Sequence, residues 1–351
     1  MSVNLAAKYE TKLDERYRLQ SRTDRFCGTN YNWEGTNAIK VWTLESPDLN
    51  DYDNTASSNR FGTPSEVDDE LHTYTLAKKR SFSKVFDITN VQDTMFVRKA
   101  NAYLKQVWDE KYVPEIDKYR LKTWANGAGQ GKIDSSALTK TTIMEAILKG
   151  HAALDDAYVP SENRATFVRS DVAVACKLAT ELNNNQTYTG KAIIRGQIGE
   201  INGSPVISVP YSIMPAGVEF MIKYKQASAD PMKLKMLRAN SDAPGYAGTL
   251  MEGLARYDSF VLANKADGIY IYAQSGVSAI PAGSTSAGKV TLVATGGTTI
   301  YYTVDGTNPK QNASKSTYST SFTCTAGVTV LAYSVTSGSL DSPVLSYVAG
   351  A

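Results

Sequence analysis

The sequence contains few of the side chains that carry nucleophilic and metal-binding chemistry. Its 351 residues include three cysteines, Cys27, Cys176 and Cys324, and two histidines, His72 and His151. The cysteines lie far apart in unlike contexts, so we predict neither a disulfide framework nor a zinc site, and a reducing compartment fits best. Each histidine is expected to be an ordinary surface or half-buried imidazole. We therefore assign no catalytic, cofactor-binding or metal-binding residue, expect no cofactor and expect that the protein is not an enzyme.

The chain also lacks a charge imbalance and long apolar runs. Lys and Arg number 37 against 35 Asp and Glu, which gives a formal net charge of +2 and no broad electrostatic attraction to nucleic acid or membranes. No segment is apolar for about 18 residues, so we expect no membrane span. The first 20 residues alternate charged and apolar residues, and we expect neither a signal peptide nor a membrane anchor there.

Three short motifs invite chemical roles that their contexts do not support. The segment NGAGQG at 126–131 follows a predicted helix and lacks the Gly-Lys-Ser/Thr ending of a phosphate-binding loop, so a helix C-cap and loop is the better interpretation. Acidic neighbours at 68–69 and 155–156 point away from each other, which favours solvated faces over paired catalytic carboxylates. The basic run at 77–84 could pair with the acidic stretch of a neighbouring copy.

The last 76 residues differ in composition from the rest of the chain. Residues 276–351 contain 34 Gly, Ser or Thr and only five charged residues. We predict a flexible linker at 276–288. Beyond it, short β-rich runs alternate with GG, DGTNP and SGS turns, which predicts a small all-β sandwich at 289–351.

The region before this tail mixes helices and strands. Apolar spacing over 91–124 predicts one long amphipathic helix or two, with Pro114 kinking the helix or starting the second. A further helix is predicted within 135–160, ending before Pro160. The segment RATFVRS predicts a strand, followed by a helix capped by Ser170 or Asp171.

Two turn signals predict more β structure after these helices. Asn202–Gly203 lies between two apolar strands, which is the strongest short hairpin signal in the chain. Residues 252–273 are predicted to form strands with a turn at Asp267–Gly268.

Residues 28–70 carry many turn formers and no sustained apolar face. Between 45 and 70, eight acidic residues stand against Arg60 alone: Glu45, Asp48, Asp51, Asp53, Glu66, Asp68, Asp69 and Glu70. A stretch this long without helical periodicity is an unusual loop for a compact domain. We interpret it as an extended arm or hairpin that is buried on another chain, which predicts assembly.

The order of these parts resembles the major capsid proteins of tailed bacteriophages of the Hong Kong 97 type. The resemblance covers roughly residues 1–275 and is carried by HTYTLAKKRSFSKVFDIT, VPEIDKYRLKTWANGA, GQIGEINGSPVISVP and the segment from 229 to 273. It implies an α+β capsid fold: an N-terminal arm at 1–35, an extended loop at 36–88, a peripheral domain with a spine helix at 89–160 and 252–275, and an axial domain at 161–251.

This resemblance also implies the partners. The expected function is self-assembly, as hexamers and pentamers, into an icosahedral shell that encloses double-stranded DNA without sequence specificity. A portal protein is implied as a further partner. Because the arm begins almost at residue 1, we expect scaffolding from a separate protein. The expected location is the virion capsid, assembled in the cytoplasm of a bacterial host, with no membrane partner.

The tail, from TTIYYTVDGTNP at 298–309 onward, resembles the immunoglobulin-like C-terminal domain of chitobiases and β-hexosaminidases. Tyr301 and Tyr302 alternate on a strand, so one is expected to pack inward, and a glycan contact through the other stays open. We expect an outward-facing decoration domain that assembly does not need. The alternative is a carbohydrate-binding surface protein that acts through this domain; a glycoside hydrolase would need two placed carboxylates, which the sequence does not offer.

Overall fold

The structure is a computed structural model. It describes residues 20–87 with short gaps between 30 and 68, residues 100–179, and residues 197–350 apart from 242, 243, 246 and 297. The described residues form two compact units. One, which we call the body, comprises 20–29 and 78–350, and the other, the loop unit, lies within 30–77. No helix among the described residues is long and apolar enough to cross a membrane.

A long interrupted helix runs through the body. It consists of α2 (Ala100–Val107), a π-helical segment at Trp108–Tyr112 and α3 (Val113–Gly127). Pro114 lies in the first turn of α3, where its missing N–H costs no helical hydrogen bond, and Glu115 lies in the same turn. The prediction of two segments with a second start at Pro114 is confirmed.

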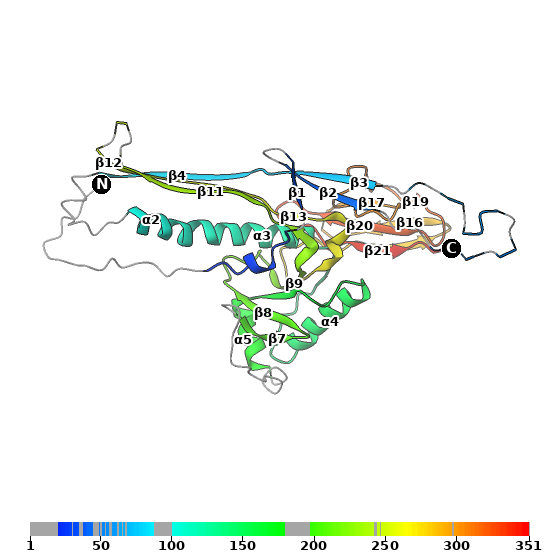
Figure 1. Ribbon diagram of the computed structural model, residues 1–351. Helices are drawn as coiled ribbons and strands as arrows, with labels where there is room; N and C mark the ends of the chain where they lie inside the picture. The colour runs from blue at the N-terminus through cyan, green and yellow to red at the C-terminus, as the bar shows by residue number, and fades with distance from the viewer. Residues whose placement is uncertain are drawn as a thin grey trace. The chain divides into compact units, whose positions relative to one another are not determined.

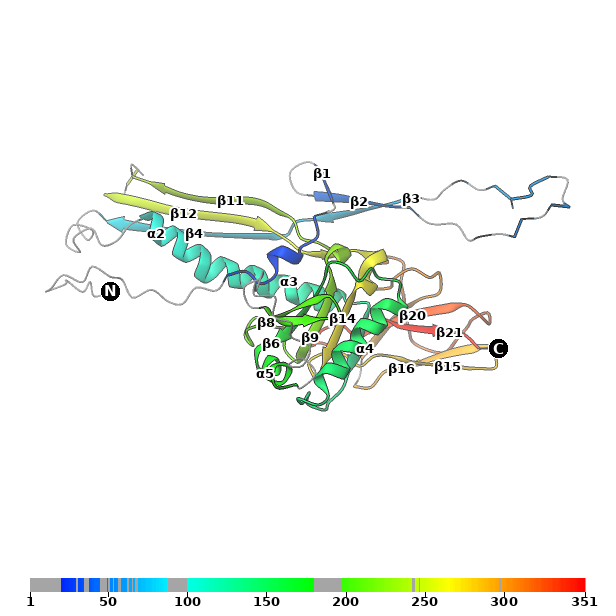
Figure 2. The same ribbon diagram turned by 60° about the horizontal axis from the view of Figure 1, so that its bottom comes forward.

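A three-stranded antiparallel sheet lies beside this helix. Its order is β11 (Met232–Asn240), β12 (Gly248–Tyr257) and β4 (Lys78–Asp87). Figure 1 and Figure 2 both show α2 running alongside these long strands. The helix packs on the sheet through Tyr112 and Ile116, which contact Ala255 and Tyr257 in one apolar cluster.

The centre of the body is a six-stranded mixed sheet. Its order is β5 (Gln130–Ile133), β14 (Ile269–Ala273), β9 (Val218–Tyr224), β6 (Arg164–Arg169), β8 (Ser204–Val209) and β7 (Gln197–Ile201). The pairs β14–β5 and β6–β8 are parallel, and the other pairs are antiparallel. A separate two-stranded pair, β10 (Ser228–Ala229) and β13 (Phe260–Val261), joins the segments after β9 and β12.

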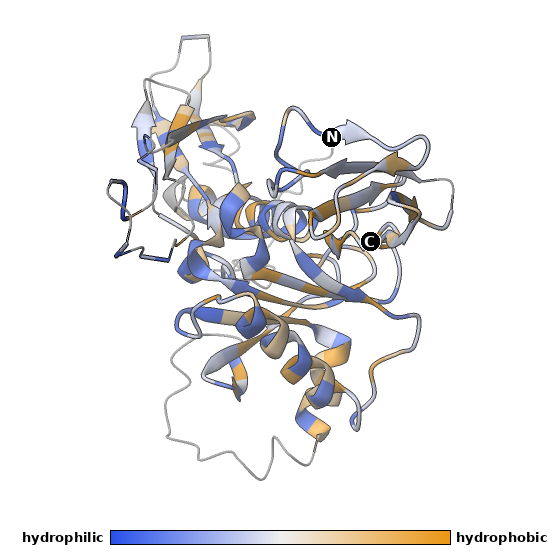
Figure 3. Cartoon of the chain, turned by 90° about the vertical axis from the view of Figure 1, so that its right-hand side faces the viewer, coloured by the Kyte–Doolittle hydropathy of each residue, from blue (hydrophilic) through white to orange (hydrophobic). Residues whose placement is uncertain are grey.

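Each face of the six-stranded sheet has its own apolar core. On β14, Ile269 and Ile271 pack with α3, whereas Tyr270 and Tyr272 pack on the opposite face, as alternation along a strand requires. That opposite face is covered by α4 (Ile143–Asp156) and α5 (Ser170–Leu178). Figure 3 shows hydrophobic residues recurring along the strands and along the helices beside them.

Local predictions in this region have mixed outcomes. The hairpin at Asn202–Gly203 is confirmed, because both residues have positive φ and join β7 to β8. The cap of α5 is wrong by one residue, since Arg169 is the N-cap and Ser170 is already helical. The turn at Asp267–Gly268 is wrong as well, because both residues end a 3-10 helix (Ala263–Gly268).

The C-terminal residues form a β-sandwich of two sheets. One is β15 (Ala282–Ser286), β16 (Lys289–Val293) and β19 (Phe322–Thr323); the other is β18 (Ser316–Thr317), β17 (Thr299–Thr303), β20 (Thr329–Val335) and β21 (Leu345–Val348). Val290, Ile300, Val330 and Ala332 are in its core. The expected linker at 276–288 therefore contains a paired strand, β15, and is not a free tether.

The loop unit contains a three-stranded antiparallel sheet. Its strands are β1 (Asn32–Glu34), β2 (Ala38–Leu44) and β3 (Asp69–Thr75). Ile39 is buried, but the outer residues of this unit keep large apolar side chains exposed, among them Trp42, Leu49, Tyr52 and Phe61. The expected single strand over 72–89 is two strands, β3 and β4, which belong to different units.

Pairing divides the body differently from the expected ranges. The segments 130–156 and 269–273, expected in the peripheral domain, supply β5, α4 and β14 to the six-stranded sheet. Conversely, β11, expected in the axial domain, pairs with β12 beside the spine helix. Sequence proximity gave the wrong grouping because neither sheet is built from one continuous stretch of chain.

Candidate functional site

The described end of the N-terminal arm is bound to α3 by a buried carboxylate. Asp117 is fully buried and accepts hydrogen bonds from Ser21 Oγ at 2.8 Å, from the backbone N–H of Arg22 at 2.8 Å and from Thr23 Oγ1 at 2.6 Å. Burial raises the pKa of Asp117, and these hydrogen bonds oppose that shift. One turn later, Arg120 forms an ion pair with Asp24, so this arm segment has both a neutral and a charged attachment to the helix.

A second buried carboxylate holds the next residues of the arm. Asp230 accepts hydrogen bonds from Trp124 Nε1 at 3.0 Å, from Ser259 Oγ at 2.5 Å and from the backbone N–H of Gly28 at 3.2 Å. Its own N–H donates to the carbonyl of Gly28. A Cβ at position 28 would lie 1.6 Å from the carbonyl oxygen of Ser228, so only glycine fits this approach.

A buried lysine completes this arm anchor. Lys223 Nζ donates to the carbonyl oxygen of Phe26 at 2.7 Å and lies 4.2 Å from the centre of the Trp124 ring. Burial lowers the pKa of Lys223 to about 8, while Asp230 opposes the shift. Phe26 itself packs edge-on against Phe167 of the central sheet. The segment 21–28 is therefore an integral part of the body core.

The C-terminal domain is fixed to the body at the end of α3. Lys310 Nζ donates to the carbonyl oxygens of Asn126 at 2.7 Å and Ala128 at 2.9 Å. These carbonyls lie at the C-terminus of the helix, where unpaired carbonyls and the helix dipole favour a cation. Desolvation lowers the pKa of Lys310 to about 7, and nearby Asp341 opposes this shift. Asn126 also exchanges two hydrogen bonds with Asp341.

Apolar and backbone contacts extend the same attachment. Leu340 is 7% exposed and belongs to the apolar cluster of the body, not to the core of the sandwich. The N–H of Val344 donates to the carbonyl of Gly129 at 2.9 Å. Gly131 lies against Pro343, where a Cβ would come within 2.8 Å of Pro343 Cγ. We call this contact region, at 126–131 and 340–344 with Lys310, the seat.

The seat explains the motif NGAGQG and corrects an expectation. A C-cap and loop after α3 is confirmed, because α3 ends at Gly127, but its small residues also allow the backbone of the C-terminal domain to approach. The interpretation of 276–288 as a tether is wrong, since Val277 pairs with Leu340 in a β-bridge and β15 joins the sandwich. Sequence could not reveal the partners of this loop, which lie more than 180 residues away.

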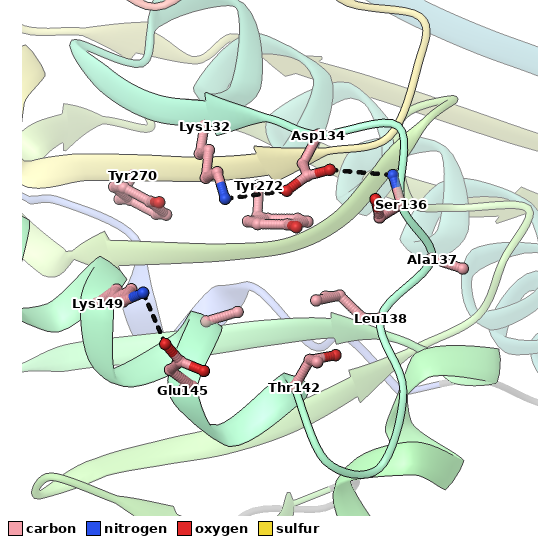
Figure 4. A pocket seen from close by; sticks show the side chains of 11 residues that line it. Lys132, Asp134, Ser136, Ala137, Leu138, Thr142, Glu145, Lys149, Tyr270 and Tyr272 are labelled. Carbon is pink, nitrogen blue, oxygen red and sulfur yellow. Dashed lines mark hydrogen bonds and ion pairs between the residues drawn. The ribbon is translucent and has the colours of Figure 1, made fainter.

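A small pocket of about 220 Å³ lies between α4, β5 and β14. Figure 4 shows two ion pairs at its wall, Lys132 with Asp134 and Lys149 with Glu145, on either side of Tyr272. Their N–O distances are 2.9 and 2.6 Å. The hydrogen bond from Lys132 lowers the pKa of Asp134 to about 2. Both carboxylates are thus ionised at neutral pH, so neither is a general acid.

The residues considered in the sequence for catalysis are not brought together. His151 is 1% exposed on α4, with its Nε2 3.5 Å from Thr166 Oγ1, whereas His72 lies on β3 of the loop unit. Asp155 forms an ion pair with buried Arg164 at 2.7 Å, and Asp156 is exposed. Asp68 and the side chain of Asp69 lie outside the described residues. Among the described residues no cluster of three or more His, Cys, Asp or Glu could hold a metal ion.

The two adjacent tyrosines of the sandwich both have ring partners. Tyr301 stacks on Tyr333 at 5.5 Å, and Lys315 Nζ lies 5.0 Å from the Tyr301 ring centre. On the other face of the strand, Tyr302 stacks on Phe322 at 4.3 Å. Both tyrosines are half-buried, so neither presents a free ring face of the kind that would stack on a sugar.

Solved structures with the same fold come from bacteriophages. A structure from Mycobacterium phage Che8 has a TM-score of 0.60 at 15% identity, covering 78% of this chain and 99% of its own. The capsid structure of cyanophage P-SCSP1u has a TM-score of 0.59 at 12% identity, covering 76% and 92%. The asymmetric unit of the bacteriophage PhiM1 mature capsid has a TM-score of 0.58 at 11% identity, covering 76% and 91%. The fold is that of Hong Kong 97-type phage capsid structures.

The C-terminal sandwich matches a different family. The model described as the chitobiase/beta-hexosaminidase C-terminal domain matches residues 280–346. The expected order, an α+β capsid fold followed by an immunoglobulin-like all-β domain, is therefore confirmed. No curated protein sequence matches the chain.

Proposed function

We propose that the chain is a major capsid protein that assembles from many copies, as hexamers and pentamers, into an icosahedral shell around double-stranded DNA. The observation that carries this proposal is the fold match to phage capsid structures over 91–92% of their own length. The role is structural and not enzymatic. It places the chain in the virion capsid, assembled in the bacterial cytoplasm with a portal and a separate scaffolding protein.

The two units suggest how the subunits divide the work of assembly. The body supplies the peripheral part, with the spine helix and three-stranded sheet, and the axial part, with the six-stranded sheet. The loop unit leaves Leu49 99% and Phe61 84% exposed, and large apolar side chains left in water favour burial on a partner. Repetition of such contacts around a closed lattice multiplies their effect.

The C-terminal domain is, in this proposal, a built-in outer domain of the subunit. The seat supports an integral role, because Lys310 and Leu340 contact the helix end and the core of the body. We therefore replace the expected dispensable decoration by a domain on which the stability of the body depends.

Electron microscopy of the expressed chain tests the main proposal. We expect capsid-like particles, or capsomers that close into shells when the other virion proteins are co-expressed. A chain that stays monomeric at high concentration, with and without those proteins, contradicts it.

A carbohydrate-binding surface protein is the second candidate, favoured by the family match at 280–346. The packed rings of Tyr301 and Tyr302 argue against it. Glycan-array binding by the full chain would support this alternative, and its loss on Tyr301→Ala would locate the contact.

A further inference from the structure

A cavity of about 620 Å³ opens on the body beside the seat, and its charges have one sign. Three cationic side chains line it: Lys118 and Lys122 from α3, and Arg169 from the end of β6. No acidic side chain lines it. The volume falls in the range of about 300–1,000 Å³ that ligand pockets occupy.

Two of these cations have no described counter-charge. Arg169 is paired with Asp171 at 2.7 Å and faces Glu219 at 3.6 Å, so its charge is largely balanced. Lys118 and Lys122 lie one turn apart on an exposed helix face, and no ion pair joins either to a described residue. Like charges at this spacing repel, which an anionic occupant would relieve.

The floor of the cavity is apolar. Ile213, Met214, Pro215 and Leu340 line it below the cations, and the ring of Tyr211, 65% exposed, lies under the Arg169 guanidinium at 5.1 Å. A cationic rim over an apolar floor fits a segment that carries both acidic and apolar side chains. A bare phosphate backbone would use the rim and leave the floor wet.

The chain contains a segment of that chemistry in the loop unit. The sequence PDLNDYD at 47–53 has three aspartates among seven residues. Leu49 is 99% exposed, Tyr52 is 55% exposed, and Asp51 is exposed between them. The basic run at 77–84 is a weaker partner for this segment, because Arg80 already pairs with Glu115 and Lys78 lies over the Tyr119 ring.

We propose that the cavity lined by Lys118, Lys122 and Arg169 is the receptor for the acidic segment 47–53 of a second copy of the chain. The aspartates meet the two lysines, and Leu49 or Tyr52 enters the apolar floor. This inference rests on the proposed capsid function and names the contact that links one subunit to the next. Complementary charge of this kind fixes register and suppresses wrong pairings.

Charge reversal and rescue in the full-length chain test the proposal. Lys118→Glu with Lys122→Glu should lower particle yield by about tenfold or more, since like charges would then face each other in every contact. Adding Asp48→Lys, Asp51→Lys and Asp53→Lys to the same chain should restore particles. The matched control, Lys177→Glu with Lys265→Glu, removes the same charge from exposed sites elsewhere and should assemble normally.

Each outcome decides the point. Wild-type yield from the Lys118/Lys122 variant overturns the proposal, as does a loss of particles that the aspartate reversal fails to rescue. If that loss comes with a weaker salt dependence of DNA binding, nucleic acid is the occupant instead. A thermal melt checks folding, and Lys118→Gln with Lys122→Gln replaces a variant that does not fold. Failure of the wild-type chain to form any particle contradicts the capsid function itself, which separates the two conclusions.

Discussion

The C-terminal domain and the loop unit both look like appendages in the sequence, yet only one of them is separate. The C-terminal domain reaches the body through Lys310, Leu340 and the backbone of Val344. The loop unit forms its own compact unit and keeps its large apolar side chains exposed. A low-charge, Gly/Ser/Thr-rich segment can therefore mean close backbone packing, whereas a charged segment can mean a surface reserved for another subunit.

Deletion of each region should separate these roles most strongly. Removing 276–351 takes Leu340 from the body core and exposes the carbonyls at the end of α3, so we expect the body to lose about 5 kcal/mol or more of stability. Removing 46–68 from the loop unit should leave the unfolding of the body unchanged and abolish particles. Denaturant unfolding followed by the fluorescence of buried Trp124 measures the first effect. A truncated body as stable as the full chain would restore the tether interpretation.

One leucine from each region gives a matched pair for the same comparison. Leu340→Ala removes a side chain that is 7% exposed in the body core, and we expect a loss of about 2–5 kcal/mol. Leu49→Ala changes a side chain that is 99% exposed, and should alter monomer stability by less than about 0.5 kcal/mol. Chemical denaturation of both variants measures the difference. Equal effects would mean that Leu49 is buried within its own chain.

Acid should destabilise the body through a residue that the loop unit does not share. Burial, and then the charge of Arg164, lower the pKa of His151 to about 4 from a model value of 6.5. The neutral imidazole is favoured in the folded state, so stability is complete above pH 6.5 and falls as the pH drops toward 4. The loss can reach about 3 kcal/mol.

His151→Leu should remove this dependence, and His72→Gln in the loop unit should preserve it. Urea unfolding at pH 7.5, 5.5 and 4 gives the slopes. An unchanged acid dependence in His151→Leu would assign it to the buried carboxylates instead.

The sequence predicted local structure better than the partners of that structure. The hairpin at Asn202–Gly203 and the start of α3 at Pro114 follow from φ preferences that act over a few residues. The seat does not, because Lys310 meets Asn126 through a fold that 184 intervening positions must build. The same holds for the pocket at Lys118 and Lys122, which Arg169 and Leu340 join only in three dimensions. Sheet grouping failed for this reason as well, since β5 pairs with β14 across most of the body.

The smallest effect that still distinguishes a seat from a tether is at Lys310. Lys310→Met keeps most of the side-chain volume but leaves the carbonyls of Asn126 and Ala128 without their donor, so we expect a loss of about 1–2 kcal/mol. Lys289→Met, at an exposed position of β16, is the control and should change little. Because the folded-state pKa of Lys310 is about 7, below its model value of 10.5, its contribution is lost as the pH falls toward 7 and complete above 10.5. The stability difference between wild type and Lys310→Met should thus widen from pH 7 to pH 9, and a difference that shrinks over that range would show that the charged ammonium holds the seat.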